Sequence, residues 1–320
     1  MPVPQVAIIS NPGSTQNLER IGRIRRVVEM SRNIVNYELD DVASIPKALE
    51  ILAKTNPSVI AISGGDGTVQ AVLGHLMNNS PFIKTPPIAI LPSGKTNMIA
   101  VDLGFKGKPE KLLKKLIKVA QNGKLEKRLT DIPLIEVNFE ADSKPLYGMF
   151  FGGAAIVNGI LHCREKIYPM GLGNVASHAL AISTLVGAAM GGPDSDNDAL
   201  KTEPLQLEVN GDRYDGRYMA LVVTTLDRLL LRAKPYGRKG NGGLGFSMIE
   251  HTPKSVLRAF FNLIIGRIGK ADIKGVVAGR SDDMVLHGPN PFTLDGEIYS
   301  PDEGQKVHLK SSAPMTFVRF

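Results

Sequence analysis

A run of glycines and small polar residues, Ile62-Ser63-Gly64-Gly65-Asp66-Gly67-Thr68, constrains the fold of this chain more than any other feature. An apolar stretch, 58–62, precedes it, and apolar residues recur at helical spacing over 69–77. Glycine lets backbone N–H groups approach an anion closely, and the first turn of a helix adds unpaired donors and a positive dipole end. The pattern predicts a strand, a glycine turn and a helix that can together hold phosphate. A glycine-rich connection without a ligand is the alternative.

Two further strand-to-helix turns carry the same kinds of residue. One follows the apolar residues 6–9 and reads Asn11-Pro12-Gly13-Ser14-Thr15. The other follows 87–91 and reads Pro92-Ser93-Gly94-Lys95-Thr96-Asn97. Strand and helix patterns alternate up to about residue 130, which predicts an open parallel α/β sheet whose strands end at a common ligand crevice. We therefore expect the three turns to line one site.

Beyond about residue 130 the pattern changes to short alternating strands and tight turns. It predicts a mostly β second half, a sandwich or a barrel, with one helical excursion. The expected elements are a hairpin of 205–209 and 218–225 around the turn 210–216, a strand pair of 132–139 and 146–151, and a helix at 172–190.

Composition favours a protein of a reducing compartment. The 320 residues suffice for two cores, and the one cysteine, Cys163, excludes an internal disulfide. The first ten residues lack the basic and long apolar parts of a signal peptide. The longest apolar stretch, 176–190, is shorter than the roughly 20 residues needed to cross a bilayer. We expect a cytoplasmic protein.

Basic residues are concentrated in two stretches, 106–128 and 228–280, of a chain whose formal net charge is +7, and the second of these includes 254–270. In 106–128, apolar residues recur at helical spacing and lysines lie on the opposite face, as in an ordinary surface helix. The stretch 254–270 instead combines Phe260, Phe261 and several Leu and Ile residues with cations and contains no acid, which is typical of an interfacial helix. A core helix with a basic outer face is equally favoured. Nucleic acid is not an expected partner, because stacking aromatics and recognised motifs are missing.

A second candidate site lies near the end of the chain, in Phe292-Thr-Leu-Asp295-Gly296-Glu297-Ile-Tyr299. Asp-Gly between two strands usually forms only a turn. Phosphoryl transfer, however, needs a carboxylate that accepts the proton of the attacking hydroxyl. Asp295 and Glu297 could supply that base and an assisting group.

These motifs, in this order, resemble the diacylglycerol kinase catalytic family, which includes bacterial diacylglycerol kinases, sphingosine kinases and ceramide kinases. The glycine run alone is shared with NAD kinases, and Asp295-Gly296-Glu297 favours the lipid branch. The resemblance implies an α/β nucleotide-binding domain over 1–130 with a return segment, 305–320. It also implies a β-sandwich lipid-substrate domain over 131–304.

The resemblance also implies roles for individual residues. Asp295 would be the general base for the lipid hydroxyl, and Glu297 would support it. Asp66 would link to Mg²⁺ or fix the glycine turn. The residues expected to bind ATP are Asn11, Gly64, Gly65, Asp66, Gly67, Thr68, Gly94, Lys95, Thr96 and Asn97.

The chain departs from the family pattern where acids are expected. Val69-Gln70-Ala71 follows the glycine run in place of x-Asn-Glu, and Met98 replaces an aspartate. The late Asp-Asp-Gly loop, associated with Mg²⁺ in bacterial members, reads Asn241-Gly242-Gly243, although Asp131 is retained. These changes deplete the metal network, so no metal ligand is assigned and Lys95 could replace part of the lost cation.

We therefore expect an ATP-dependent lipid kinase that uses ATP and Mg²⁺. It would act on diacylglycerol, a sphingoid base or ceramide as a peripheral protein on the inner membrane face. The alternative is a catalytically weak or inactive lipid-binding protein of the same fold. The sequence leaves the lipid, the structural Mg²⁺ site and a homodimeric state open.

Overall fold

The computed structural model of the chain divides into two compact units, residues 1–132 with 314–320 and residues 133–313. The structure describes residues 5–14, 20–94, 96–140, 143–162, 202–229, 240–265, 267–268, 272–288 and 291–320. Cys163, Lys95 and the helix expected at 172–190 lie outside the described residues.

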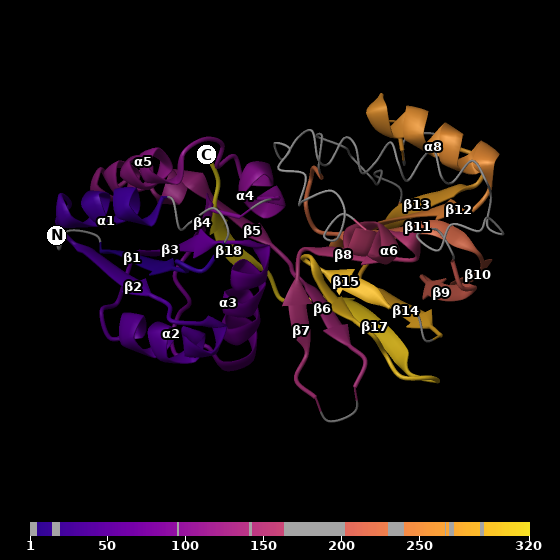
Figure 1. Cartoon of the computed structure of the whole chain (residues 1–320), viewed down its shortest axis with the longest axis horizontal. Helices are drawn as coiled ribbons and strands as arrows, with labels where there is room; N and C mark the ends of the chain where they lie inside the picture. Colours follow the sequence, from indigo (N-terminus) through magenta and orange to yellow (C-terminus); the bar gives the residue numbers. More distant parts are fainter. Residues whose placement is uncertain are drawn as a thin grey trace. The chain divides into compact units, whose positions relative to one another are not determined.

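The first unit is a six-stranded sheet in the order β2-β1-β3-β4-β18-β5, with helices on both faces (Figure 1). The first four strands are parallel, and β18 joins β4 in parallel and β5 antiparallel. Helices α1 and α5 cover one face, and α2 and α3 cover the other. The strands are β1 (Val6–Ser10), β2 (Ile34–Glu38), β3 (Val59–Gly64), β4 (Ile88–Pro92), β5 (Leu129–Ile132) and β18 (Met315–Val318). The helices are α1 (Ile21–Glu29), α2 (Ile45–Ala53), α3 (Asp66–Asn79), α4 (Met98–Asp102) and α5 (Pro109–Gln121), with 3₁₀ turns η1 (Val42–Ser44) and η2 (Glu126–Arg128).

The apolar patterns explain this layering. Strands β1, β3 and β4 are buried along their whole length, as expected for parallel strands covered on both faces. Helix α5 buries a stripe that includes Leu113 and Leu116 and leaves its lysines outside, as the sequence predicts. The α/β fold expected for the first half is therefore confirmed.

The return segment is shorter than 305–320, and this boundary needs correction. Strand β17 (Lys306–Ser311) pairs with β14 (Asp283–His287) and β6 (Ile135–Asn138) of the second unit, so only 314–320 belongs to the first. The reason is the alternation in β17, which buries Val307 and Leu309 in the core of the second unit. Phe320 completes the first unit by donating its backbone N–H to the Leu103 carbonyl, at 2.9 Å.

The second unit contains two antiparallel six-stranded sheets, β10-β9-β14-β17-β6-β7 and β13-β12-β11-β8-β15-β16. Their inner faces share one apolar core, to which Phe151 and Phe292 contribute from one sheet and Leu286 from the other. The expected β sandwich is confirmed. Its strands are β6 (Ile135–Asn138), β7 (Leu146–Gly148), β8 (Phe150–Gly153), β9 (Leu205–Val209), β10 (Asp212–Gly216), β11 (Tyr218–Thr224), β12 (Leu244–Glu250), β13 (Val276–Ser281), β14 (Asp283–His287), β15 (Phe292–Leu294), β16 (Glu297–Tyr299) and β17.

The hairpin predicted from 205–209 and 218–225 is wrong. Strand β9 pairs instead with β10, and β11 enters the other sheet. Asn210 and Gly211 both have positive φ, 53° and 86°, so they form a two-residue hairpin turn of the kind that Asn-Gly favours. The segment 212–216, expected to be part of a long turn, is therefore a strand.

Two helices lie on the outer face of the second sheet. Helices α6 (Ala155–His162) and α8 (Pro253–Ile264) share a small apolar cluster made by Ala155, Met219 and Val256. Among the described residues, no helix combines the length and the hydropathy that crossing a bilayer requires.

Candidate functional site

Three loops meet at the carboxyl ends of β1, β3 and β4, as their positions in the sequence predict. The buried hydroxyls of Ser63 and Ser93 lie 3.0 Å apart and join the ends of β3 and β4. The Ser14 hydroxyl donates to the Ser93 carbonyl at 3.1 Å, and the Asn11 amide donates to the Thr68 hydroxyl at 2.8 Å. These bonds tie the turn after β1 to both other turns, so the three loops form one polar cluster, named here the phosphate cradle.

The glycines of the phosphate cradle do not all serve the same purpose. A Cβ on Gly94 would lie 2.8 Å from the Gly65 Cα, and one on Gly64 would lie 2.6 Å from the Thr68 Cβ. These two glycines are therefore required for packing. Among the residues that the structure describes, a Cβ on Gly65 would meet no atom closer than 3.8 Å, so these residues leave room there. Gly65 is the glycine whose bare backbone is best explained by close approach of a ligand.

Helix α3 starts directly at this open glycine. Gly65 is its N-cap, and no side-chain hydrogen bond caps the helix. The first N–H groups of a helix have no intrahelical acceptor, and the helix dipole makes this end positive. Gly67 and Thr68 belong to this first turn. The 14-residue helix thus presents donors beside Gly65 that suit a phosphate.

Asp66 connects α3 to the turn after β4. Burial raises the pKa of the Asp66 carboxyl to about 6, and a hydrogen bond from the Asn97 backbone N–H acts in the opposite direction. This bond joins the start of α3 to the turn after β4 and does not involve the glycine turn that Asp66 was expected to fix. A carboxyl group with this pKa carries less negative charge near neutral pH than an ordinary aspartate.

Asn97 shapes the turn itself. Its side-chain oxygen accepts from the Gly94 backbone N–H at 2.7 Å, and its amide donates to the Gly94 carbonyl at 2.6 Å. Asn97 has φ of 51°, a left-handed conformation that asparagine tolerates better than most residues. Its amide is therefore engaged in building the turn, and Thr96 lies partly buried within it.

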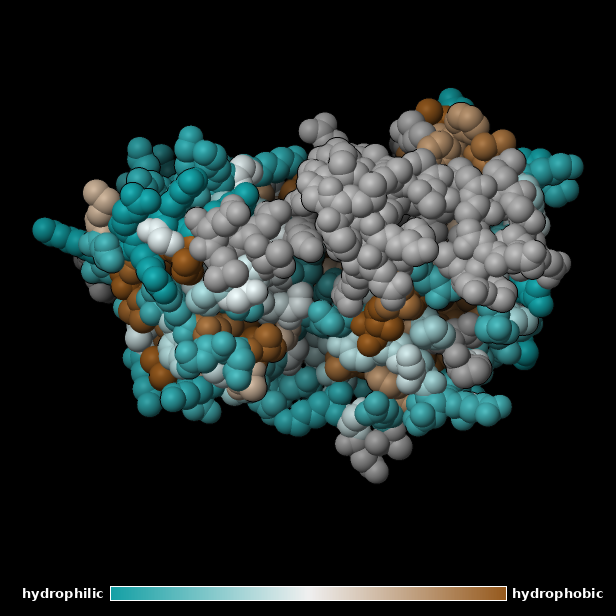
Figure 2. Space-filling model, viewed as in Figure 1, coloured by the Kyte–Doolittle hydropathy of each residue, from teal (hydrophilic) through white to brown (hydrophobic). Residues whose placement is uncertain are grey.

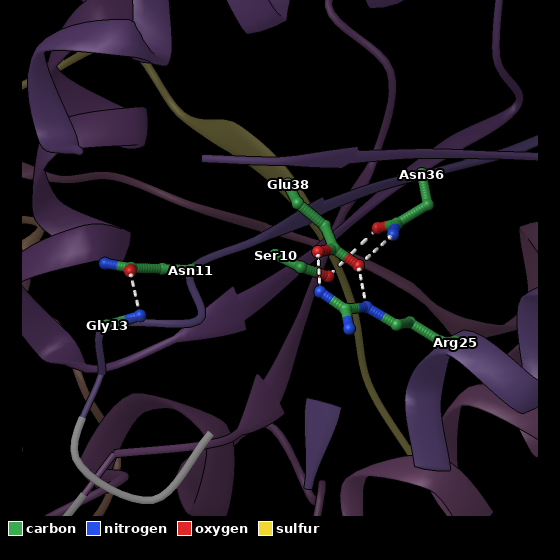
Figure 3. A network of polar contacts seen from close by, with 6 residues as sticks. All are labelled: Ser10, Asn11, Gly13, Arg25, Asn36 and Glu38. Carbon is green, nitrogen blue, oxygen red and sulfur yellow. Dashed lines mark hydrogen bonds and ion pairs between the residues drawn. The ribbon is translucent and has the colours of Figure 1, made fainter. Parts of the chain in front are cut away.

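A polar network lies next to the cradle, at the ends of β1 and β2 (Figure 3). Arg25 of α1 binds both carboxylate oxygens of Glu38, at 2.8 and 2.6 Å. Asn36 donates to Glu38 at 3.2 Å and accepts from Ser10 at 3.0 Å. The hydrogen bond with Arg25 lowers the pKa of Glu38, and the same bond raises the pKa of Arg25. This network positions α1 beside the cradle.

Sequence reasoning missed four residues around the cradle. Ser14, Ser63 and Ser93 stand inside the recognised turns, but their partners are distant in sequence and could not be read from the pattern. Arg20, just before α1, places its guanidinium 3.5 Å from the Pro92 carbonyl at the end of β4. In the sequence, Arg20 could have been noticed as a basic residue in the loop after the first strand. Arg20 brings positive charge to the cradle.

The second candidate site is built around the Asp295-Gly296 turn. Both residues have positive φ, 50° and 96°, as in a two-residue turn between antiparallel strands, here β15 and β16. Asp295 is only 5% exposed, and its carboxylate accepts from the Met149 N–H at 3.0 Å and the Phe150 N–H at 2.9 Å. A Cβ on Gly148 would lie 2.7 Å from this carboxylate. The turn therefore directs its carboxylate inward and holds it by charge-assisted bonds.

Glu297, the first residue of β16, is exposed, whereas Asp295 is buried. Thr225, which the sequence did not single out, is linked to Asp295 through Met149. Thr225 donates its backbone N–H to the Met149 carbonyl at 3.1 Å, and Met149 binds Asp295. Over the part of the chain that the structure describes, the buried Thr225 hydroxyl has no hydrogen-bond partner. A polar acceptor or donor on a substrate could satisfy it.

The residues that correspond to a structural Mg²⁺ site do not fit one. Within the described ranges, no three His, Cys, Asp or Glu side chains gather closely enough to hold a metal ion. In the loop that reads Asn241-Gly242-Gly243, the Arg280 guanidinium donates to the Gly242 carbonyl at 2.7 Å and the Gly243 carbonyl at 3.2 Å. Asp131 accepts instead from the Thr316 hydroxyl at 2.7 Å. A guanidinium thus supplies positive charge to this loop.

Comparison with known proteins identifies what this arrangement resembles. Residues 5–124 match the family model of the diacylglycerol kinase catalytic domain. The crystal structure of a candidate diacylglycerol kinase from Bacillus anthracis str. Sterne matches with a TM-score of 0.68 and 16% identity, over 100% of this chain and 98% of its own. A diacylglycerol kinase structure from the same organism matches with a TM-score of 0.63 and 14% identity over the same shares. At these identities the structural likeness concerns the fold. No curated protein matches the sequence.

Proposed function

We propose that this chain, whose residues 5–124 match the model of the diacylglycerol kinase catalytic domain, is an ATP-dependent lipid kinase. The reaction transfers the γ-phosphoryl group to a hydroxyl of diacylglycerol, a sphingoid base or ceramide. The observation that carries this proposal is the phosphate cradle, where the open space at Gly65 adjoins the uncapped start of α3. Phosphoryl transfer depends mainly on positioning and charge stabilisation, which such a site can supply.

On the donor side, backbone N–H groups at the start of α3 bind the phosphates of ATP. Gly65 lets the phosphate approach, while Gly94 and Asn97 hold the neighbouring turn in place. Asp66 fixes the same turn through the Asn97 N–H. Arg20 adds a cation at the end of β4, which offsets part of the phosphate charge.

On the acceptor side, Asp295 acts as the general base. Its carboxylate accepts the proton of the lipid hydroxyl while that oxygen forms a bond to the γ-phosphorus, and the bond from the γ-phosphorus to the bridging oxygen of ADP breaks. A carboxylate can accept about four hydrogen bonds, so the Met149 and Phe150 N–H groups do not by themselves exhaust it. Those two donors instead fix its direction.

Mg²⁺, which kinases commonly use with ATP, would neutralise negative charge that develops during the transfer. The described residues assemble no additional structural site for it, and no step is derived through such a site. This is the observation that favours the second candidate function, a lipid-binding protein with weak or no catalysis. The guanidinium of Arg280, from β13, binds the loop where the family pattern places acids.

A lipid-panel assay separates the two candidates. The purified chain is incubated with γ-labelled ATP and mixed micelles that contain diacylglycerol, sphingosine or ceramide, with and without Mg²⁺. The kinase proposal expects label in one lipid class and none with the Asp295→Asn variant. Binding of ATP and lipid without labelled product would support the lipid-binding alternative.

A further inference from the structure

Helix α8 exposes a stripe of large apolar side chains. Leu257, Phe261 and Ile265, at its C-cap, are 39%, 58% and 59% exposed. They follow one another at intervals of four residues, and residues at this spacing share one face of a helix. Figure 2 shows brown, hydrophobic atoms on the surface at the upper right, where Figure 1 places α8. Water thus contacts an apolar ridge on this helix.

This ridge is not the side of α8 that packs on the protein. Val256 and Ala259 are buried on the opposite face, and Val256 contacts the cluster with Met219 on the outer face of the second sheet. The helix begins at a well-formed cap, where the Thr252 hydroxyl accepts from the Ser255 N–H at 3.3 Å. The core therefore already occupies one side of α8, and the exposed ridge needs a different explanation.

Cations flank the ridge on the same outward face. Lys254 lies one turn before Leu257, Arg258 follows it, and both are exposed. The sequence from 254 to 270 contains no acidic residue. A protein partner usually offers charges of both signs, whereas an anionic bilayer offers uniform negative charge above an apolar layer. Charge complementarity therefore favours a lipid surface.

Helix α5 provides an internal comparison. Its exposed side carries Lys111, Lys114, Lys115 and Lys118, and its large apolar side chains are buried. It resembles α8 in charge but has no exposed apolar ridge. The combination of ridge and cations distinguishes α8 from this simply basic helix.

We propose that α8 docks the second unit on the surface of an anionic bilayer. Leu257, Phe261 and Ile265 insert at the boundary between headgroups and acyl chains, and Lys254 and Arg258 contact lipid phosphates. The proposal rests on the proposed function in one respect, that the bilayer would supply the acceptor lipid. Docking itself requires neither ATP nor catalysis. Under this proposal the two sequence-based interpretations apply to different faces of α8: one face packs on the protein and the other contacts lipid.

Vesicle co-sedimentation of the full chain tests the docking. Vesicles of phosphatidylcholine with phosphatidylglycerol are compared with phosphatidylcholine alone. We expect the triple variant Leu257→Ser/Phe261→Ser/Ile265→Ser to lower binding to the anionic vesicles at least about 30-fold. Lys254→Gln/Arg258→Gln should lower it about tenfold or more there, and change it little on phosphatidylcholine.

Matched controls separate insertion from general charge and general hydrophobicity. Lys111→Gln/Lys114→Gln removes two cations from α5, and Ile83→Ser removes a fully exposed apolar side chain elsewhere. The affinity of both variants for anionic vesicles should stay within about threefold of wild type, because isolated surface groups contribute little to vesicle binding. Equal losses in the α5 variant and the α8 variants would overturn the proposal, and so would wild-type binding by the triple serine variant.

Two further readouts distinguish other outcomes. If the ridge instead contacts a second copy of the chain, sedimentation velocity without lipid would show a dimer that the triple variant loses, which would overturn the bilayer assignment. Activity on a dispersed short-chain acceptor should persist in the triple variant. Asp295→Asn should bind vesicles like wild type and yet transfer no phosphate, so failure of docking and failure of the kinase proposal give different results.

Discussion

Replacement of Asp295 by Asn tests the acceptor side of the proposed chemistry with little change in shape. Asparagine tolerates the φ of 50° at this position, and its side-chain oxygen can keep the place of the carboxylate oxygen nearest the Phe150 N–H, at 2.9 Å. The amide group then faces the Met149 N–H, which lies 3.0 Å from the other oxygen and 3.2 Å from the retained one. The substitution therefore removes the negative charge and one acceptor but retains the turn.

The size of the structural effect follows from these two bonds. Hydrogen bonds to a charged group contribute about 1.5–3 kcal/mol and neutral ones about 0.5–1.5 kcal/mol, so losing the charge costs roughly 1 kcal/mol for each donor. We expect the free energy of unfolding to fall by about 2–3 kcal/mol. A typical stability of about 5–15 kcal/mol leaves the variant folded at 25 °C.

The catalytic effect should be larger and of a different kind. A general base contributes roughly 10²–10⁴-fold to the rate, so kcat for lipid phosphorylation should fall by that factor while the Kd for ATP stays within about twofold. Urea unfolding, ATP titration and the lipid kinase assay measure the three quantities. Asp282→Asn is the matched control, because this exposed carboxylate also accepts a backbone N–H, from Gly243 at 2.6 Å. Asp282→Asn should retain kcat.

One pattern of results would refute this reasoning. If Asp295→Asn loses about 2–3 kcal/mol of stability but less than about tenfold in kcat, Asp295 is only a turn residue. A structural role of Asp295-Gly296 in the hairpin turn would then explain the motif without catalysis.

The donor side supports three further predictions. Gly65→Ala should raise the Kd for ATP at least about tenfold in calorimetric titration and change the unfolding free energy by less than about 1 kcal/mol. Gly94→Ala should instead destabilise the fold. Equal ATP affinity in wild type and Gly65→Ala would contradict the proposal that phosphate uses the open space at Gly65. Folding raises the pKa of Asp66 from 3.8 to about 6, so the ionised group opposes folding. Asp66→Asn should leave the unfolding free energy unchanged below about pH 4, increase it as the pH rises to 6, and give a constant increase of no more than ~3 kcal/mol above that pH. A difference between variant and wild type that does not depend on pH in urea unfolding would exclude this cause. Arg20→Gln should weaken ATP binding about tenfold. Arg23→Gln is the control, because the guanidinium of Arg23 lies 3.5 Å from Glu110, and this variant should bind ATP like wild type. Equal effects of the two substitutions would argue against a specific role for Arg20.

The phosphate cradle could be predicted because its signals are local. Each turn follows an apolar strand and precedes a helical pattern, and parallel strands end at a common edge. The bonds that join the turns could not be predicted, since Ser14 meets Ser93 and Asn11 meets Thr68 only after the sheet has formed. The pKa of Asp66 likewise depends on burial by tertiary packing.

The second half was predicted less completely, for two physical reasons. Asn210-Gly211 permits a two-residue turn, but the longer polar run 210–216 also resembles a loop, and pairing with β9 decides between them. The alternation in β17 fits either unit until Val307 and Leu309 are seen in the sandwich core. Arg280, which donates to the Gly242 carbonyl, comes from a strand that the sequence pattern did not connect with that loop.

The central claim is phosphoryl transfer from ATP to a lipid hydroxyl, and the most direct test follows the label itself. Wild-type protein is incubated with γ-labelled ATP and mixed micelles that contain all candidate lipids, and the lipid extract is separated by thin-layer chromatography. The account predicts one labelled lipid product that is absent with Asp295→Asn. Label that remains in ATP or appears only as inorganic phosphate, from protein that binds ATP, would contradict it.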